Sequence, residues 1–134
     1  FNKPKVARFF AWMGLVGAVI AFVFPDPSDF MWPHLTNLTF VSTHCFIAMG
    51  SIMVIARNDV KLCVIDACVM TVVMNAFLVI VNAMLGSNYG YLTELPPGIP
   101  LQLNKYMLFV LLTAVISGGE PLLDRAYAAI KMHD

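Results

Sequence analysis

The chain has 134 residues, of which 60% are hydrophobic and 12% are charged, and its formal net charge is zero. A soluble domain of ordinary composition has about 45–50% apolar and about 25% charged residues, so one soluble core could not bury this much apolar surface. The neutral charge and the lack of a basic tract exclude nucleic acid as a partner, and the composition predicts an integral membrane protein.

Four apolar segments predict an all-α fold, a polytopic bundle of four transmembrane helices in a single domain. In chain order we expect the helices at about residues 6–24, 35–56, 61–85 and 103–120. A bilayer core of about 30 Å needs about 20 helical residues. The fourth segment reaches that length only with its neighbours, because Gly118-Gly119 and Pro121 interrupt it. An interfacial or re-entrant segment is the alternative there.

The distribution of lysine and arginine predicts the orientation of the bundle. Five of these residues lie in the N-terminal segment and at the second loop or beside it: Lys3, Lys5, Arg8, Arg57 and Lys61. Because basic residues are retained in the cytoplasm, we expect both termini to be cytoplasmic in a multi-pass protein of the cell membrane. The loops at 25–34 and 86–104 then lie outside. The chain begins at Phe1 rather than Met, which is consistent with the C-terminal part of a longer protein or with a processed form.

The third loop, residues 87–104, is long, and its prolines prevent it from being helical throughout. Its apolar residues argue against disorder, so we expect an ordered cap over the outer mouth. In this cap Tyr89 and Tyr91 are expected to pack against the helix ends. Asn88 is expected to satisfy backbone groups where the third helix stops, since Asn suits helix termini and turns.

Polar side chains recur every seven residues in the second and third helices. They are Asn37, His44 and Ser51 in one helix, and Cys68, Asn75 and Asn82 in the other. A spacing of seven keeps side chains on one stripe, and a short connection makes the two helices neighbours. The two stripes lie at equal depth from the outer ends, which predicts that His44 and Asn75 bond directly or through one water. The alternative is interhelical hydrogen bonding that only holds helices together.

His44 is the candidate catalytic residue, as a general base, because an ionisable side chain in mid-membrane is a functional hypothesis by default. The substrate-binding candidates are Asn37, Ser51, Asn75, Asn82, Asn88 and Tyr89. No nucleophile shares the His44 face, since Thr43 and Cys45 point about 100° away. A metal site is not expected, because no second histidine or acidic ligand lies on that face, and no cofactor is predicted. The three cysteines are interpreted as small hydrophobic residues.

Two segments resemble the YwaF-like bacterial integral membrane proteins. One is FAWMGLVGA at residues 10–18, which runs on to FPD at 24–26, and the more specific one is NAMLGSNYGYL at 82–92. His44 lies where that family tends to place a histidine after a phenylalanine in the next helix. The resemblance extends from about Phe9 to Ser117. Members of that family are longer, with additional helices before the matched portion.

This resemblance implies a function, since the YwaF-like proteins are distantly similar to eukaryotic transmembrane acyltransferases that remodel ether phospholipids. It implies a membrane-embedded pocket for acyl chains with a histidine near the chemistry, although no residue here can be assigned as the nucleophile. The first hypothesis is therefore a lipid acyltransferase or hydrolase with membrane lipids as its partners. The second is a non-enzymatic membrane subunit or a small-solute transporter component, whose polar stripe orders helix packing in a homo-oligomer or with other subunits.

Overall fold

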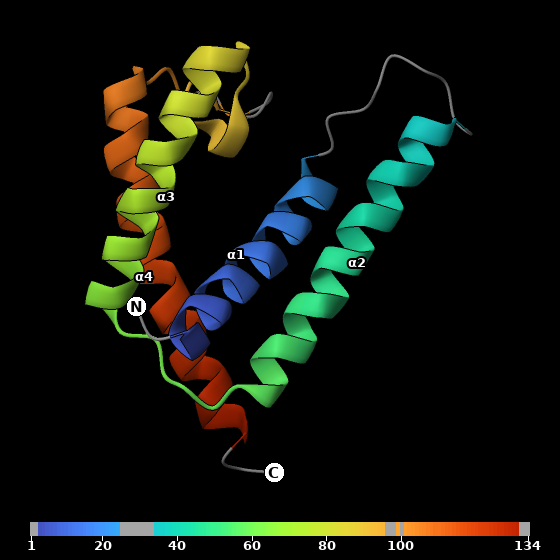
Figure 1. The fold of residues 1–134 in the computed structure, drawn as a ribbon, viewed down its shortest axis with the longest axis vertical. Coiled ribbons are helices and arrows are strands. Elements are labelled where there is room, and N and C mark those ends of the chain that lie inside the picture. Colours follow the sequence, from blue (N-terminus) through green and yellow to red (C-terminus); the bar gives the residue numbers. More distant parts are fainter. Residues whose placement is uncertain (1–2, 25–33, 96–98, 100, 132–134) are drawn as a thin grey trace. The chain divides into compact units, whose positions relative to one another are not determined.

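The computed structural model describes residues 3–24, 34–95, 99 and 101–131 (Figure 1). Within these residues the chain is all-helical, as predicted, and contains no strand. The elements are α1 (Lys3–Val23), α2 (Leu35–Arg57), α3 (Val64–Leu85), the 3-10 turn η1 (Tyr89–Tyr91) and α4 (Lys105–Lys131). All four α-helices are long and apolar enough to cross a membrane. The greater part of the expected first loop, residues 25–33, lies outside the described residues.

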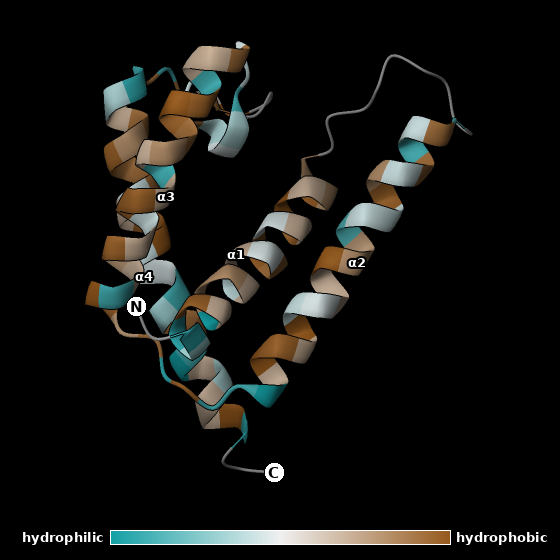
Figure 2. Ribbon diagram, in the orientation of Figure 1, coloured by the Kyte–Doolittle hydropathy of each residue, from teal (hydrophilic) through white to brown (hydrophobic). Residues whose placement is uncertain are grey.

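The chain divides into two compact units, residues 1–60 and residues 61–134, which are described separately. Unit 1 pairs α1 with α2, and unit 2 pairs α3 with α4 and η1. Figure 2 shows hydrophobic residues along all four helices. Many large apolar side chains point away from the protein, among them Leu38, Phe46 and Ile80, which are 58%, 69% and 59% exposed. Lipid is the natural surrounding for such surfaces.

In unit 1 the helices approach closely at a glycine. A Cβ atom added to Gly14 of α1 would lie 2.6 Å from Ser51 Oγ and 3.2 Å from Ile47 Cγ2 of α2. Small residues at such crossings let helix backbones come together, which drives helix association in lipid. Gly17, one turn further along α1, meets nothing within 4 Å. Gly14 therefore provides the notch that receives Ser51.

Substitution of Gly14 tests this notch. We expect Gly14→Ala to destabilise unit 1 by about 1–3 kcal/mol, because the added methyl overlaps the Ser51 hydroxyl. The matched control, Gly17→Ala, is expected to be neutral or stabilising by less than about 1 kcal/mol, since alanine favours the helix. Thermal unfolding of the detergent-solubilised protein, followed by circular dichroism, measures both. Ser51→Ala combined with Gly14→Ala should restore part of the lost stability. Equal changes in stability for Gly14→Ala and Gly17→Ala would contradict the notch.

The ends of α1 and α2 are joined by a buried arginine. Arg8 is only 4% exposed, and its guanidinium donates to the carbonyl of Ile55 at 3.0 Å and to the carbonyl of Asn58. The side chain of Asn58 in turn donates to the carbonyl of Pro4 at 2.7 Å. The last carbonyls of a helix have no partner within the helix, so a cation placed there satisfies them. These bonds hold the start of α1 against the end of α2.

In unit 2, α4 continues to Lys131, well beyond the end expected near residue 120. Pro121 lies inside the helix, where its missing N–H removes one backbone bond. Prolines and glycines are tolerated within membrane helices because neighbouring groups compensate, and the sequence prediction gave these residues too much weight. Near this end, the amide of Leu62 donates to Asp124 Oδ2 at 2.9 Å. Asp124, 2% exposed, thus ties α4 to the segment that precedes α3.

The expected cap at residues 87–104 lies partly outside the described residues, at 96–98 and 100; the described start of the loop is folded, but not by the residues expected. Gly86 ends α3 in a left-handed conformation (φ 62°), as is common after a helix. Asn88 does not satisfy the helix end; its side chain accepts from the amides of Thr93 and Glu94 at 2.9 and 3.2 Å, further along the loop. Tyr89 is 55% exposed rather than packed, and the buried apolar side chain is Leu92, at 2%. The buried side chain of this turn is therefore that of Leu92, which is smaller than the tyrosine expected there.

Candidate functional site

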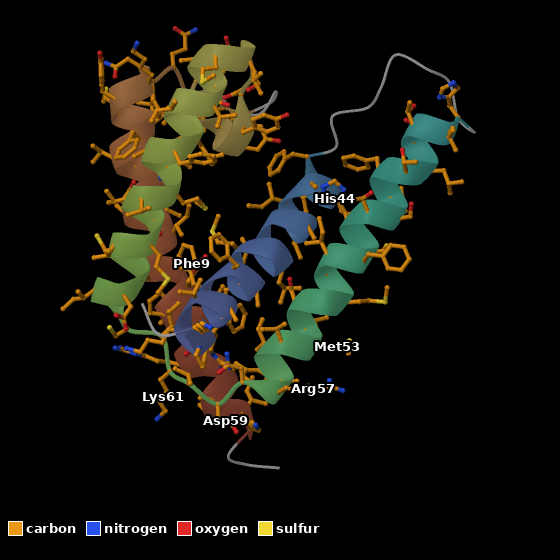
Figure 3. All side chains as sticks on the ribbon, in the orientation of Figure 1. Phe9, His44, Met53, Arg57, Asp59 and Lys61 are labelled. Carbon is orange, nitrogen blue, oxygen red and sulfur yellow. The ribbon has the colours of Figure 1, made fainter. Side chains whose placement is uncertain are left out.

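His44 lies in the contact between α1 and α2 (Figure 3). Its ring is half-buried and meets two phenylalanine rings: Phe40, with centroids 4.4 Å apart, and Phe22 of α1, at 6.0 Å in an edge-on arrangement. Phe22 and Phe40 also contact each other edge-on at 6.4 Å. Aromatic pairs of this kind prefer defined mutual orientations. The two phenylalanine rings therefore fix the position of the imidazole.

The hydrogen bond of His44 determines its neutral tautomer. Nδ1 lies 2.8 Å from the carbonyl oxygen of Phe40, one turn earlier in α2. A carbonyl only accepts, so Nδ1 carries the proton and donates. In the neutral ring Nε2 then holds the lone pair, and it has no hydrogen-bond partner among the described residues. His44 therefore presents a basic nitrogen beside apolar aromatic surfaces.

The two other residues of the α2 stripe have different surroundings. Ser51 is 7% exposed and sits at the Gly14 notch of α1, so the packing of unit 1 accounts for its position. Asn37 is half-buried in the first turn of α2. Helix α2 thus turns His44 and Ser51 toward α1.

Asn75 of α3 is 2% exposed, and its side-chain amide donates to Thr113 Oγ1 of α4 at 3.0 Å. This is the interhelical hydrogen bond that the alternative interpretation of the stripe predicts. The stripes of α2 and α3 belong to different units, so the expected pairing of His44 with Asn75 stays a prediction. The bond to Thr113 nevertheless occupies one of the two donor hydrogens of Asn75.

Asn82 is the most highly connected of the candidate binding residues. It is 6% exposed, and its side chain donates to the carbonyl of Tyr89 at 3.0 Å while accepting from the Tyr89 amide at 2.8 Å and from Ser87 Oγ at 3.0 Å. One side chain thereby satisfies both backbone groups of Tyr89. Asn82 fixes η1 to the end of α3, which is a structural role.

A cavity of about 730 Å³ lies in unit 2, where α3 ends and α4 begins. Its walls are alanine, valine, leucine and phenylalanine side chains, and polar groups of Asn82, Ser87, Thr93, Lys105 and Tyr106 join them. Pockets that hold small molecules have this size range and this mixture of apolar walls with a few polar groups. Of the substrate-binding candidates predicted from the sequence, Asn82 lines this cavity.

Four polar residues on α4 were missed by the sequence interpretation. Thr113, Ser117, Glu120 and Asp124 follow each other at spacings of four, three and four, which places them on one helical face. Ser117, Glu120 and Asp124 are 5%, 4% and 2% exposed, and neither carboxylate oxygen of Glu120 has a hydrogen-bond partner among the described residues. The spacing was visible in the sequence, but the expected break at Pro121 concealed it. The described residues hold no group of three histidine, cysteine or acidic side chains that could bind a metal.

A model of the TMEM164 family matches residues 1–118 of the chain. The match covers α1, α2, α3, η1 and the first half of α4, and so includes His44 and the residues of the cavity. Comparison with curated proteins and with solved structures gave no match. The more specific resemblance to YwaF-like bacterial proteins stays a prediction.

Proposed function

This chain belongs to the TMEM164 family of membrane proteins, and from the geometry of His44 we propose that it is a multi-pass enzyme that transfers or hydrolyses acyl chains of lipids. His44 acts as the general base. The observation that carries the proposal is the bond from His44 Nδ1 to the Phe40 carbonyl, which leaves Nε2 as the proton acceptor. A general base must hold a lone pair at neutral pH and be oriented toward its substrate, and the rings of Phe22 and Phe40 provide that orientation.

The chemistry needs no nucleophilic side chain. Nε2 of His44 accepts a proton from a hydroxyl group, whose oxygen attacks the carbonyl carbon of an acyl ester. The tetrahedral intermediate then breaks the ester bond, and the imidazolium returns the proton to the departing alkoxide. A lipid hydroxyl as the attacking group gives acyl transfer, and water gives hydrolysis. Thr43 and Cys45 point away from the His44 face, which is consistent with a substrate hydroxyl as the attacking group.

A second candidate function is a non-enzymatic membrane subunit, and the other polar residues favour it. Asn75 bonds to Thr113, Asn82 bonds to the η1 turn, and Ser51 fills the Gly14 notch. Each of these contacts stabilises the protein by itself. In that case the bond between His44 and Phe40 is one more packing contact.

Lipid analysis separates the two functions. In cells that lack the gene and express His44→Asn, we expect the same change in acyl-chain composition as in cells without the protein. Asparagine keeps a donor for the Phe40 carbonyl but has no basic nitrogen. A loss of activity in this variant is therefore caused by the loss of the base. Removal of a general base lowers rates by about 10²–10⁴-fold. Lipid mass spectrometry of membranes with matched protein levels provides the measurement.

The matched control is His34→Asn. His34 caps the start of α2, where its Nδ1 accepts from the amide of Thr36 at 3.3 Å, and asparagine is an equally good cap. His34→Asn is expected to restore the lipid composition fully. If His44→Asn restores it as well, His44 is not a base and the enzymatic proposal is wrong for this residue.

A further inference from the structure

The buried face of α4 carries a carboxylate without a partner. Glu120 is 4% exposed, and neither of its carboxylate oxygens has a hydrogen-bond partner in the part of the chain that the structure describes. At about 1.5 Å per residue it lies about 22 Å from Lys105 and about 16 Å from Lys131, the two ends of α4, and so inside the span. A charge buried in this way is costly unless a counter-charge or a proton neutralises it.

The other charged residues at this end of unit 2 do not neutralise Glu120. Lys61 and Arg125 are exposed. Asp124 and Asp66 are themselves acidic, and the first accepts from a backbone amide before α3 while the second accepts from a thiol at the start of α3. The charge of Glu120 is therefore left for a ligand to balance.

Ser117, one turn before Glu120, has a second oxygen without a partner. A buried serine or threonine in a helix can donate to the carbonyl four residues earlier, as Thr71 of α3 donates to Ala67 at 2.7 Å. The Ser117 hydroxyl is buried, at 5% exposure of the residue, and makes neither that bond nor any other to the described residues. A spacing of three makes Ser117 and Glu120 neighbours on the helix surface, yet they do not bond to each other. Two neighbouring buried oxygen groups can therefore bind a ligand.

Pro121 adds a third oxygen to this face. Because proline has no N–H, the carbonyl of Ser117, four residues earlier, loses the donor that an α-helix normally supplies. In membrane transporters, backbone carbonyls that are freed where a helix is interrupted coordinate sodium ions. The hydroxyl and the carbonyl of Ser117 and the carboxylate of Glu120 thus form a set of oxygen ligands on one face of α4.

Helix α3 contributes a small residue and a hydroxyl at the same depth. Two hydrogen bonds set the antiparallel register of α4 against α3 and the residue before it, Leu62 to Asp124 and Asn75 to Thr113. This register places Ala67, the smallest buried side chain of α3, at the depth of Glu120. Thr71 lies near the depth of Ser117, and its hydroxyl oxygen keeps lone pairs because it acts as the donor in its bond to Ala67.

We propose that Ser117 and Glu120 bind a sodium ion inside the membrane, with the Ser117 hydroxyl, the Ser117 carbonyl and the Glu120 carboxylate as ligands. All three ligands are oxygens, which hard cations prefer. One carboxylate balances the charge of a monovalent cation, whereas a calcium ion would leave a net positive charge in the span. A proton on Glu120 would neutralise the carboxylate but would leave both oxygens of Ser117 unexplained. Acyl transfer by His44 uses no metal ion, so this site goes beyond the proposed function.

Carbodiimide labelling in detergent micelles tests the site. Dicyclohexylcarbodiimide modifies carboxyl groups in apolar surroundings, and a bound cation protects them. In choline chloride at constant pH we expect a label on Glu120, located by mass spectrometry of peptides. Sodium at about ten times its half-protecting concentration should reduce this labelling about ten-fold at the same ionic strength, and calcium should protect less. Equal labelling in sodium and choline chloride, or stronger protection by calcium than by sodium, would overturn the proposal.

Variants of the two neutral ligands test the geometry. Pro121→Ala returns an N–H to the Ser117 carbonyl, and Ser117→Ala removes the hydroxyl. Each should raise the half-protecting sodium concentration about ten-fold. Alanine favours a helix more than proline does, so a weaker sodium affinity in Pro121→Ala is not caused by loss of the helix. The matched control is Leu122→Ala, because Leu122 is 67% exposed and its substitution should leave the affinity unchanged.

Thermal unfolding measures binding without the carbodiimide. Sodium at about ten times its half-saturating concentration should raise the unfolding midpoint by about 4 °C relative to choline chloride. Glu120→Gln should abolish this shift, whereas Glu94→Gln, at an exposed acidic residue in the loop after α3, should retain it. A sodium shift that persists in Glu120→Gln, or equal sodium affinities in Ser117→Ala and Leu122→Ala, would contradict the site.

Discussion

Replacement of Asn82 by alanine is expected to release the η1 turn from the end of α3. The side chain makes three hydrogen bonds, two of them to the amide and the carbonyl of Tyr89. Each unsatisfied buried group costs about 1–3 kcal/mol, and we expect Asn82→Ala to lose about 3 kcal/mol of local stability. In hydrogen exchange of the micellar protein, protection of the Tyr89 amide should then fall about 100-fold. The cavity beneath the turn should lose its shape at the same time.

Asn82→Asp and Asn88→Ala serve as comparisons. Aspartate keeps the acceptor for the Tyr89 amide and for Ser87 but loses the donor to the Tyr89 carbonyl, so an intermediate loss is expected. Asn88 is exposed, and water can replace its bonds to Thr93 and Glu94, so Asn88→Ala should reduce protection of Tyr89 by less than about five-fold. If Asn82→Ala and Asn88→Ala had equal effects at Tyr89, Asn82 would not be the anchor.

Hydropathy was sufficient to predict the class of fold and the first three helices closely. The end of the fourth helix was missed, because Gly118-Gly119 and Pro121 have low helix propensity in water and the prediction applied that propensity to a membrane helix. Extending the helix would have brought Glu120 and Asp124 onto the face of Thr113. Acidic residues in a membrane segment almost always face the protein interior, so Glu120 and Asp124 indicate a buried helical face more strongly than the glycines indicate a helix end.

The candidate site was predictable in part. The spacing of seven placed Asn75 and Asn82 on one face of the third helix, and both are buried, at 2% and 6% exposure. The spacing could not identify their partners. Asn82 bonds to a turn a few residues later in the chain. Asn75 bonds to α4, and the register of α4 against α3 depends on the loop that connects these two helices. The tautomer of His44 also required coordinates, since it depends on the distance to the Phe40 carbonyl.

Removal of the Arg8 guanidinium is expected to cause the largest loss of stability in unit 1. Arg8 satisfies the carbonyls of Ile55 and Asn58 at the end of α2, and the bond to Ile55 is buried while the bond to Asn58 is partly buried. Hydrogen bonds from charged groups contribute about 1.5–3 kcal/mol each, so Arg8→Met should cost about 3–5 kcal/mol. The methionine keeps most of the aliphatic packing, so the loss reports the hydrogen bonds. Thermal and denaturant unfolding in micelles measure it.

The matched control for Arg8 is Arg57→Met, because Arg57 is also basic and lies in the last turn of α2 but is exposed. Its substitution should change stability by less than about 0.5 kcal/mol, as is usual for surface positions. Arg8→Lys keeps the charge but replaces a planar fork of donors by one ammonium group, which cannot reach two carbonyls in the same geometry. We expect it to recover about half of the loss. Equal losses for Arg8→Met and Arg57→Met would mean that net charge, and not the two carbonyl bonds, accounts for the stability that Arg8 confers.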